Sequence, residues 1–304
     1  MNEPRPILIT GGTGQVGFEL RTALARLGPV VAPMRSELDL ANPDSIRDVV
    51  RAQRPAVIVN AGAYTAVERA DGDAELAAQL NTVAPGVLAE EAARLDSLLV
   101  HYSTDYVFDG TAARPYRESD APAPLNAYGR TKLAGERAII GVAGRHLILR
   151  TSWVYGARGS NFFRTMLRLA REPRDIPVVD DQVGAPTWSR SLAQATVAII
   201  ERLSEARDAE GGLYHLGSAG SASWNAFAQA ILEEARAVDQ VAGSISSDAR
   251  IVRITTAEFA SRVRRPAYSV LDSSMVRARF GVGISDWRSD LRIVVGELAR
   301  ITAS

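Results

Sequence analysis

A tyrosine and a lysine four positions apart, Tyr128 and Lys132, are the residues of this sequence best suited to chemistry. Prolines lie upstream at 122 and 124, and the run 131–140 is rich in good helix formers, so the pair is expected at the opening of a helix. A spacing of four places both side chains on one face, one turn apart. Because an ammonium stabilises a neighbouring phenolate, Lys132 could tune Tyr128 to transfer a proton near neutral pH. Alone, the same pattern also fits a buried tyrosine near a solvated lysine.

The composition narrows the class of protein. With 304 residues, 46% hydrophobic and 23% charged, the chain is expected to be a globular protein with a large core. The formal net charge is zero, which argues against nucleic acid or an anionic membrane as a partner held by bulk charge. Arginine greatly outnumbers lysine, so Lys132 stands out, and the absence of cysteine excludes disulfides and thiolate sites. We find no signal peptide or apolar run of membrane-spanning length, and we expect a soluble cytoplasmic protein.

The elements that must position this pair follow from alternating patterns in the first half. Short apolar runs, expected as strands, alternate with helical stretches; the runs are 7–10, 30–33, 56–60, 98–103 and 147–150, and the helical stretches are 17–27, 43–52, 74–95 and 131–140. This alternation predicts an α/β fold with a doubly wound, parallel, Rossmann-type sheet, because continuous apolar strands need helices on both faces.

After about residue 150 the rhythm loosens, with loops expected at 156–161, 171–187 and 217–223. We therefore expect residues 1–150 to form a dinucleotide-binding domain, with a return segment near 185–215. Residues 151–304 are expected to form mainly a smaller, interleaved substrate lobe. A ligand would bind at the carboxyl ends of the strands, beneath that lobe.

The turn after the first strand carries three glycines, Gly11, Gly14 and Gly17, around Gln15 and Val16. Glycine lets the backbone turn sharply and approach a ligand closely, and the following helix N-terminus favours a pyrophosphate. The spacing is GxxGxxG rather than GxGxxG. Its place between a strand and a helix nevertheless predicts dinucleotide binding.

The ends of the second and third strands indicate how such a cofactor would lie. Arg35 follows the second strand, where a basic residue accommodates a 2′-phosphate, so NADPH is favoured and NADH is the alternative. Asp39 and Leu40 are expected near the adenine. The stretch 60–65 closes the third strand with small residues, among them Ala61 and Ala63, against which a flat cofactor could lie.

The fourth strand ends in hydroxyl groups. Thr104 is the better candidate to hydrogen-bond a substrate carbonyl, because it lies deepest toward the crevice, whereas Ser103 should face the other way. A threonine in a strand is often only a β-former.

Together these motifs resemble the extended short-chain dehydrogenase/reductase superfamily and, within it, the dTDP-4-dehydrorhamnose reductase family. The similarity covers nearly the whole chain, and its supporting stretches are 13–17, 60–67, 103–110, 128–132, 150–156, 161–162, 181–187 and 265–266. The stretches 103–108 and 181–187 are far more specific than the glycine turn.

The resemblance implies roles for individual residues. Tyr128 would be the proton donor. Lys132 would adjust the pKa of Tyr128 and bind a ribose, and Thr104 would supply the hydroxyl that orients the carbonyl. The cofactor contacts would include, besides Tyr128 and Lys132, the residues Gly11, Gly14, Gln15, Val16, Gly17, Arg35, Asp39, Leu40, Ala61, Ala63, Tyr64, Thr65 and Tyr102. The nucleotide-sugar contacts would be Val67, Thr104, Asp105, Trp153 and Arg265, with an ion pair as the alternative role of Arg265. Asn81 resembles an asparagine that holds a helix kink near the lysine.

The implied reaction is NADPH-dependent reduction of the C4 keto group of a dTDP-4-dehydro sugar, in a protein that could be a homodimer. A 4,6-dehydratase of the same superfamily would carry glutamate where this chain has Tyr106, which argues against dehydration. A related 4-ketoreductase or 4-epimerase stays open, as does a non-catalytic regulatory subunit of a methionine adenosyltransferase.

A magnesium ion held by glutamates at a dimer contact is also implied for some such reductases. Glu19 and Glu297 occupy suitable positions, but Arg190 stands where a third carboxylate is expected. Because a hard cation needs several oxygen ligands, we predict no metal site and leave Mg²⁺ open.

Overall fold

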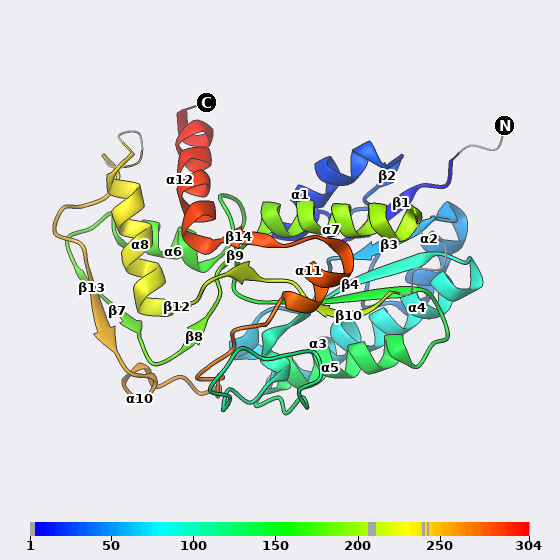
Figure 1. Ribbon diagram of the computed structural model, residues 1–304, viewed down its shortest axis with the longest axis horizontal. Helices are drawn as coiled ribbons and strands as arrows, with labels where there is room; N and C mark the ends of the chain where they lie inside the picture. Colours follow the sequence, from blue (N-terminus) through cyan, green and yellow to red (C-terminus); the bar gives the residue numbers. More distant parts are fainter. Residues whose placement is uncertain (1–3, 206–210, 239–240, 242, 304) are drawn as a thin grey trace.

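A six-stranded parallel sheet lies at the centre of the computed structural model, which describes residues 4–205, 211–238, 241 and 243–303 (Figure 1). Its order is β10-β5-β4-β3-β1-β2, with bounds β1 (Ile7–Thr10), β2 (Val30–Val31), β3 (Val57–Asn60), β4 (Leu98–Thr104), β5 (His146–Thr151) and β10 (Gly212–His215). β1, β3 and β4 are buried along their whole length, as strands covered on both faces must be. The predicted fold class is confirmed.

Helices cover both faces of this sheet. One face packs against α1 (Gln15–Ala23), its short 3₁₀ extension η1 (Leu24–Arg26), α7 (Ser189–Glu205) and α11 (Ser274–Phe280). The other face packs against α2 (Pro43–Gln53), α4 (Ala84–Arg94) and α5 (Ala127–Ile140). The chain leaves β1 toward β2 on one side and then crosses to β3 on the other, so the strand order reverses between β1 and β3. In doubly wound sheets, ligands bind at the carboxyl ends of the strands beside such a reversal.

The helical stretch expected at 74–95 is divided into α3 (Ala74–Ala78), a π-helical turn η3 (Gln79–Val83) and α4. Asn81 lies in the π turn, and its backbone carbonyl packs so closely on Gly135 of α5 that a Cβ at position 135 would collide with it. π turns are frequent at functional sites, and this one aims the Asn81 side chain at the loop after β3.

The remaining elements build a second core around α6, α8 and α12. Their bounds are β6 (Val154–Tyr155), α6 (Phe162–Leu169), β7 (Asp175–Val179), β8 (Val183–Gly184), β9 (Thr187–Trp188), β11 (Ser218–Ala219), β12 (Ala222–Ser223), α8 (Trp224–Arg236), β13 (Arg250–Ile254), α10 (Thr256–Phe259), β14 (Ile284–Asp286) and α12 (Trp287–Ala303). Between them, α7 and β10 return to the central sheet, where β10 pairs with β5.

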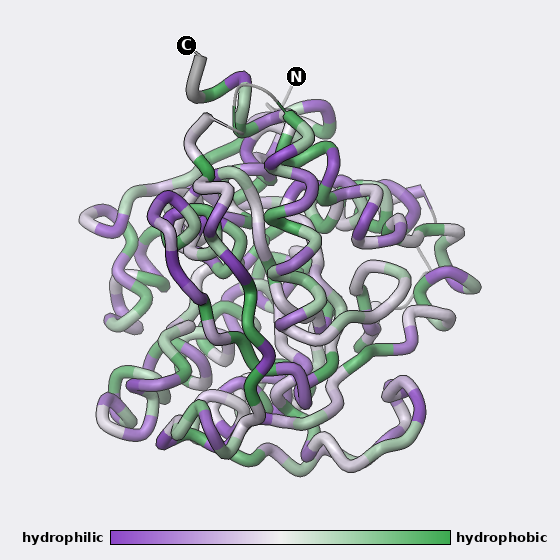
Figure 2. The backbone as a smooth tube through the Cα atoms, turned by 90° about the vertical axis from the view of Figure 1, so that its left-hand side faces the viewer, coloured by the Kyte–Doolittle hydropathy of each residue, from purple (hydrophilic) through white to green (hydrophobic). Residues whose placement is uncertain are grey.

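Two of the segments expected as loops contain strands instead. Within 171–187, β7 pairs in parallel with β13 about seventy residues later, and β8 pairs with β12 inside 217–223. The partners are too distant in sequence for a local pattern to reveal them, because only tertiary pairing orders such short strands. Hydrophilic and hydrophobic residues are mixed along the chain (Figure 2), and within the described ranges no helix has the length and apolar character needed to cross a bilayer.

Candidate active site

The start of helix α5 sets the position of Tyr128. The side chain of Asn126 accepts a hydrogen bond from the Gly129 N–H at 2.9 Å and so caps the helix. Gly129 lies directly against the Tyr106 carbonyl, where a Cβ would collide. The helix therefore begins at Ala127, with Tyr128 in its first turn, pressed against the end of β4.

Tyr128 lies beside Thr104, and burial has the largest effect on the pKa of Tyr128. Burial raises the pKa of Tyr128 to about 12, against a hydrogen bond with Thr104 that lowers it. The ring also packs edge-on against Tyr106, with 5.7 Å between the centroids. The expected lowering of this pKa by Lys132 is not found, because burial disfavours the phenolate more than the hydrogen bond with Thr104 favours it, and Asp105 raises the pKa further.

Lys132 is the only lysine in the sequence, and only 2% of it is exposed. Its amino group donates to the Tyr102 carbonyl at 2.6 Å and lies 3.2 Å from Nε2 of His101. Burial lowers the pKa of Lys132 to about 8, against the carboxylate of Glu136, which raises it. A lysine with this pKa can exchange a proton close to neutral pH.

Behind Lys132, the side chains of β4 alternate between the two faces of the sheet as predicted. Ser103 faces helix α5 and donates to Glu136 Oε1 at 2.5 Å. Glu136 in turn forms a buried two-pronged ion pair with Arg150 of β5, with nitrogen–oxygen distances of 2.9 and 2.7 Å. The sequence interpretation missed His101, Glu136 and Arg150; polar residues at spacing two mark one face of β4, but they do not indicate which helix lies against it.

Asp105 is a buried carboxyl group that directly follows Thr104 at the carboxyl end of β4. Its Oδ1 accepts from the Thr104 hydroxyl at 3.1 Å, and its Oδ2 has no hydrogen-bond partner within the described part of the chain. Burial raises the pKa of Asp105 to about 7, although the hydroxyl groups of Ser269 and Thr104 lower it. A buried oxygen without a partner is suited to receive a hydrogen bond from a ligand.

The glycine turn forms as predicted, and two of its glycines are needed by the chain itself. Gly11 has φ +66°, and a Cβ there would lie 2.6 Å from the backbone of Gly62; a Cβ at Gly17 would collide with the Gly11 carbonyl. Gly14 is exposed, so the α1 N-terminus is open to a ligand. Val16 packs against the core, and Gln15 accepts from Asn161 of the opposite lobe at 2.8 Å.

A cavity of about 190 Å³ extends this turn toward β2. Four residues predicted to contact a cofactor besides Gly11 line it: Arg35, Asp39, Leu40 and Ala63. The guanidinium of Arg35 is largely exposed and lies 3.9 Å from the Asp39 carboxylate, too far for a tight pair. Arg35 is thus free to turn toward an anionic group in the cavity.

The loop after β3 is braced from the π turn. Asn81 accepts from the backbone N–H of Tyr64 at 2.9 Å and donates to its carbonyl at 3.0 Å. The Tyr64 hydroxyl donates to Asp73. Of the other residues expected to contact the cofactor here, Thr65 is exposed and Ala61 packs against the core. The ring of Tyr102 is directed into the core under α7, where its hydroxyl bonds Thr196, so only the Tyr102 backbone carbonyl faces Lys132.

The residues expected to contact a sugar nucleotide form two groups. Val67 begins the 3₁₀ turn η2 (Val67–Arg69), and the next residue, Glu68, forms an ion pair with Arg265. Trp153, with φ +47°, stacks on Trp224 of α8 with 3.5 Å between ring centroids and covers Gly184. A non-glycine residue with positive φ is held there by its surroundings, here by the two-tryptophan stack.

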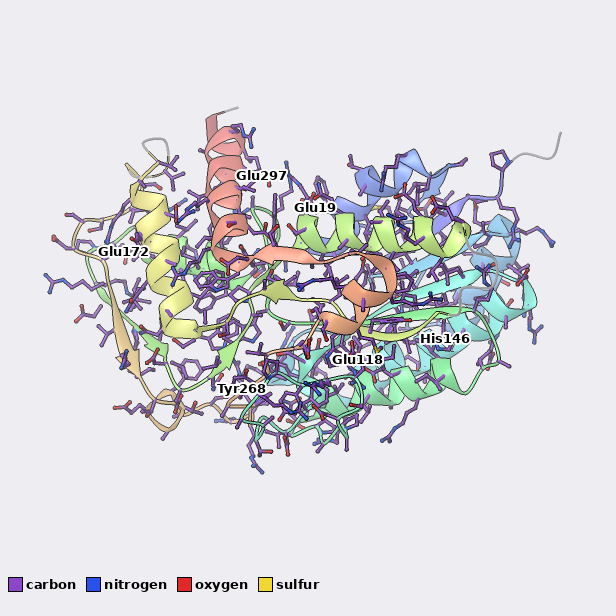
Figure 3. All side chains as sticks on the ribbon, in the orientation of Figure 1. Glu19, Glu118, His146, Glu172, Tyr268 and Glu297 are labelled. Carbon is purple, nitrogen blue, oxygen red and sulfur yellow. The ribbon has the colours of Figure 1, made fainter. Side chains whose placement is uncertain are left out.

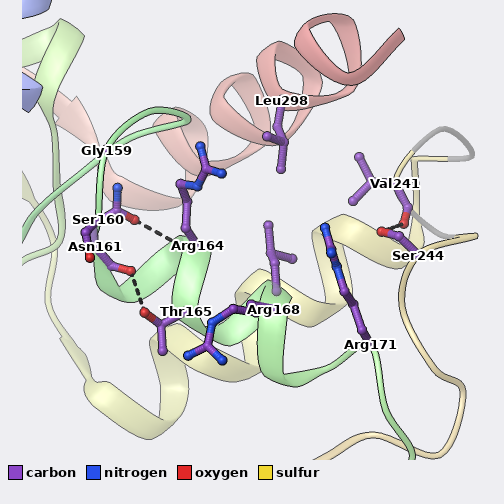
Figure 4. A pocket seen from close by; sticks show the side chains of 11 residues that line it. Gly159, Ser160, Asn161, Arg164, Thr165, Arg168, Arg171, Val241, Ser244 and Leu298 are labelled. Atoms are coloured by element: carbon purple, nitrogen blue, oxygen red, sulfur yellow. Dashed lines mark hydrogen bonds between the residues drawn. The ribbon is translucent and has the colours of Figure 1, made fainter.

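A larger cavity, about 670 Å³, lies apart from these residues. It lies between α6 and α12, and its lining includes Arg164, Arg168 and Arg171 (Figure 4). None of the predicted catalytic residues lines it, so the polar residues at the carboxyl ends of the strands are the better candidate site.

Where related reductases would place a magnesium ion, a guanidinium stands in place of the third carboxylate. Arg190 bonds Glu19 of α1 at 2.8 Å and Glu297 of α12 at 2.5 Å, and the two glutamates lie near each other at the junction of these helices (Figure 3). A divalent cation does not fit between carboxylates already paired with arginine. Across the described ranges, no group of three or more histidine, aspartate or glutamate side chains is placed to hold a metal ion.

The chain is similar to a well-defined set of proteins. Residues 5–300 match the family model described as the RmlD substrate binding domain. A dTDP-4-dehydrorhamnose reductase from Burkholderia thailandensis is 47% identical over 295 residues, covering 96% of this chain and 98% of that protein. The enzyme of the same name from Escherichia coli K12 is 40% identical, covering 98% and 99%.

The fold is similar to that of a solved structure with a bound cofactor. The dTDP-4-dehydrorhamnose reductase from Bacillus anthracis, crystallised in complex with NADP, superposes with a TM-score of 0.86 at 32% identity. The superposition covers 97% of this chain and 99% of that one.

Proposed function

The chain belongs to the RmlD substrate binding domain family, and on that premise we propose that it reduces the C4 keto group of dTDP-4-dehydro-β-L-rhamnose with NADPH, giving dTDP-L-rhamnose. The observation that carries the proposal is the convergence of Tyr128, Thr104 and Lys132 at the carboxyl end of β4. These groups can orient a carbonyl and deliver a proton to the alkoxide formed from it.

The residues present fit NADPH. The exposed Gly14 at the α1 N-terminus suits a pyrophosphate, and the cavity lined by Arg35, Asp39 and Leu40 suits an adenosine that carries a 2′-phosphate. When bound, NADPH supplies the hydride. Lys132 and the loop from Ala63 to Thr65 would hold the rest of the cofactor along the strand ends.

The chain's own side chains supply orientation and the proton. Thr104 would hold the keto oxygen beside Tyr128, whose hydroxyl remains protonated at neutral pH because burial raises its pKa to about 12. Tyr128 then donates this proton to the oxygen that becomes the C4 hydroxyl. Asp105, Val67, Trp153 and Arg265 would hold the sugar nucleotide, and Arg265 would have to leave Glu68 to reach a diphosphate.

We expect Asp105 to make substrate affinity depend on pH. Burial raises the pKa of Asp105 to about 7, so the carboxyl is protonated below that pH and becomes a stronger acceptor for sugar hydroxyls above it. The KM for the sugar nucleotide should therefore fall as the pH rises through about 7, and steady-state kinetics should show no such step in Asp105→Asn. Asp109→Asn, which alters a carboxylate bonded to Tyr116, is the control that should retain the step.

We expect Arg35 to select NADPH over NADH. Arg35→Ala removes the cation beside the expected 2′-phosphate and should raise the KM for NADPH about tenfold, corresponding to ~1.4 kcal/mol, without changing the KM for NADH. Arg47→Ala, on α2 and paired with Asp44, is the control. Equal losses with both cofactors would contradict the assignment.

The direct test is the loss of NADPH absorbance after addition of enzymatically generated dTDP-4-dehydro-β-L-rhamnose. Turnover supports the reductase. Tight NADPH binding without turnover would favour another keto sugar, and then the non-catalytic regulatory role. The proposal also includes a cytoplasmic location and a homodimer. Sedimentation equilibrium would measure the mass of that dimer.

A further inference from the structure

Behind Lys132 lies a chain of buried polar side chains that the proposed mechanism does not use. His101 Nε2 is 3.2 Å from the lysine nitrogen, and Asn60 Nδ2 is 3.0 Å from the other ring nitrogen, Nδ1. The Thr10 hydroxyl lies 2.6 Å from Asn60 Oδ1. The exposed fractions of Thr10, Asn60, His101 and Lys132 are 0, 1, 0 and 2%. Because water does not reach these side chains, the hydrogen bonds between them must be formed by their own donors and acceptors.

The direction of these hydrogen bonds follows from the Thr10 end. Thr10 Oγ1 accepts the Gly62 N–H at 3.4 Å and donates its own hydrogen to Asn60 Oδ1. The Asn60 amide nitrogen then faces His101 and donates to Nδ1. With the amide reversed, no acceptor among the described residues would remain for the Thr10 hydroxyl.

The imidazole must consequently present an N–H to the lysine. Burial, together with the nearby Lys132, keeps the pKa of His101 well below its usual range, so the ring is neutral and carries one hydrogen. Because Nδ1 accepts from Asn60, that hydrogen is on Nε2 and points at Lys132 Nζ. A hydrogen-bond donor facing this nitrogen stabilises the neutral amine, which has a lone pair, over the ammonium, which has none.

The other groups around Lys132 do not replace this effect. The Tyr102 carbonyl accepts from the lysine in either protonation state. The charged and titratable groups on the packed elements are Glu136 and Tyr128 on α5, Arg150 on β5 and Asp105 after β4. Glu136 favours the ammonium, but its two oxygens are already bonded by Arg150 and Ser103.

We propose that His101 is a positioning residue for Lys132, which holds the lysine nitrogen against the Tyr102 carbonyl and biases it toward the neutral amine by donating from Nε2. The effect on turnover rests on the proposed function. The contact itself involves only this chain's own residues and can be measured without substrate.

The composition of the chain makes this measurement unusually selective. Because Lys132 is the only lysine, protein labelled with [ζ-¹⁵N]lysine has a single labelled side-chain nitrogen, whose titration NMR can follow without substrate. His101→Phe removes the donor and should raise the titration midpoint by about one pH unit, the difference that one hydrogen bond makes between two protonation states. His101→Gln, which can turn a carbonyl toward an ammonium, should raise it further.

The matched control is His146→Phe, at the start of β5 (Figure 3), where, among the residues that the structure describes, the ring bonds only the Gly144 carbonyl. It should leave the lysine titration unchanged. An unchanged or lowered midpoint in His101→Phe would overturn the proposal. If that variant does not fold, His101→Gln decides alone: an upward shift supports the proposal, and no shift overturns it.

A second readout separates positioning from a merely structural role. In the pH profile of kcat, the limb that belongs to Lys132 should move by the same amount as the NMR midpoint, whereas simple loosening of the fold would lower kcat at every pH without moving the limb. If the midpoint shifts but the proposed substrate is not turned over, the proposed function fails and the assignment of His101 stands.

Discussion

Tyr128→Phe should reduce kcat for NADPH-dependent keto-sugar reduction by roughly 10²–10⁴-fold, the usual worth of a general acid. The substitution removes only the hydroxyl. The ring can keep its edge-on contact with Tyr106, and the helix cap at Asn126 is untouched. Stopped-flow absorbance of NADPH at saturating sugar nucleotide measures the effect.

The control is Tyr116→Phe, which deletes a hydroxyl bonded to Asp109 and leaves the ring stacked on Phe108. It should retain nearly full kcat. Binding of NADPH to Tyr128→Phe, followed by fluorescence, should remain within a few-fold of the unsubstituted protein. Near-normal turnover in Tyr128→Phe would remove Tyr128 from the mechanism and leave the proton donor unassigned.

Arg150→Met should lower the free energy of unfolding by about 3–5 kcal/mol, because it leaves the Glu136 carboxylate buried without its cation. The side chains of this pair are 4% and 2% exposed, and Arg150 also lies over the Phe108 ring. Urea unfolding, followed by circular dichroism, measures the change. Arg26→Met breaks a surface pair whose side chains are 57% and 33% exposed, and should cost less than about 1 kcal/mol.

The double variant Arg150→Met with Glu136→Leu tests the cause. If the cost arises from an unpaired buried charge, removing the charge as well should restore much of the lost stability. If the loss of stability in the double variant equals the sum of the losses in the two single variants, the packing of the two side chains rather than their charge is responsible. The assay does not depend on substrate, so its result is independent of the proposed reaction.

Local patterns predicted the elements that carry the site well. The strand bounds of β1 and the helix bounds of α2 and α5 agree with the expected ranges to within a few residues, because caps and turns such as Asn126 and Gly11 act over a few neighbours. The loop expected at 171–187 was wrong, since β7 depends on a partner far along the chain.

The residues of β4 that contact Lys132 and Glu136 could be recognised only from the tertiary structure. Residues 101 and 103 are separated by about 6.6 Å along a strand, and residues 132 and 136 by about 6.0 Å along a helix. When α5 lies on β4, these repeats match, so His101 meets Lys132 and Ser103 meets Glu136. Nothing in either segment alone indicates that the other lies against it.

By itself, the sequence determined the parallel α/β architecture, the glycine turn and the tyrosine–lysine pair that we propose for catalysis, because these depend on periodicity and on spacings within one element. The tertiary structure alone decided the chemistry of that pair. Burial, rather than a neighbouring ammonium, sets the acidity of Tyr128, and contacts from β4 set the surroundings of Lys132. Desolvation and hydrogen-bond geometry depend on which distant segments meet, and a linear pattern does not carry that information.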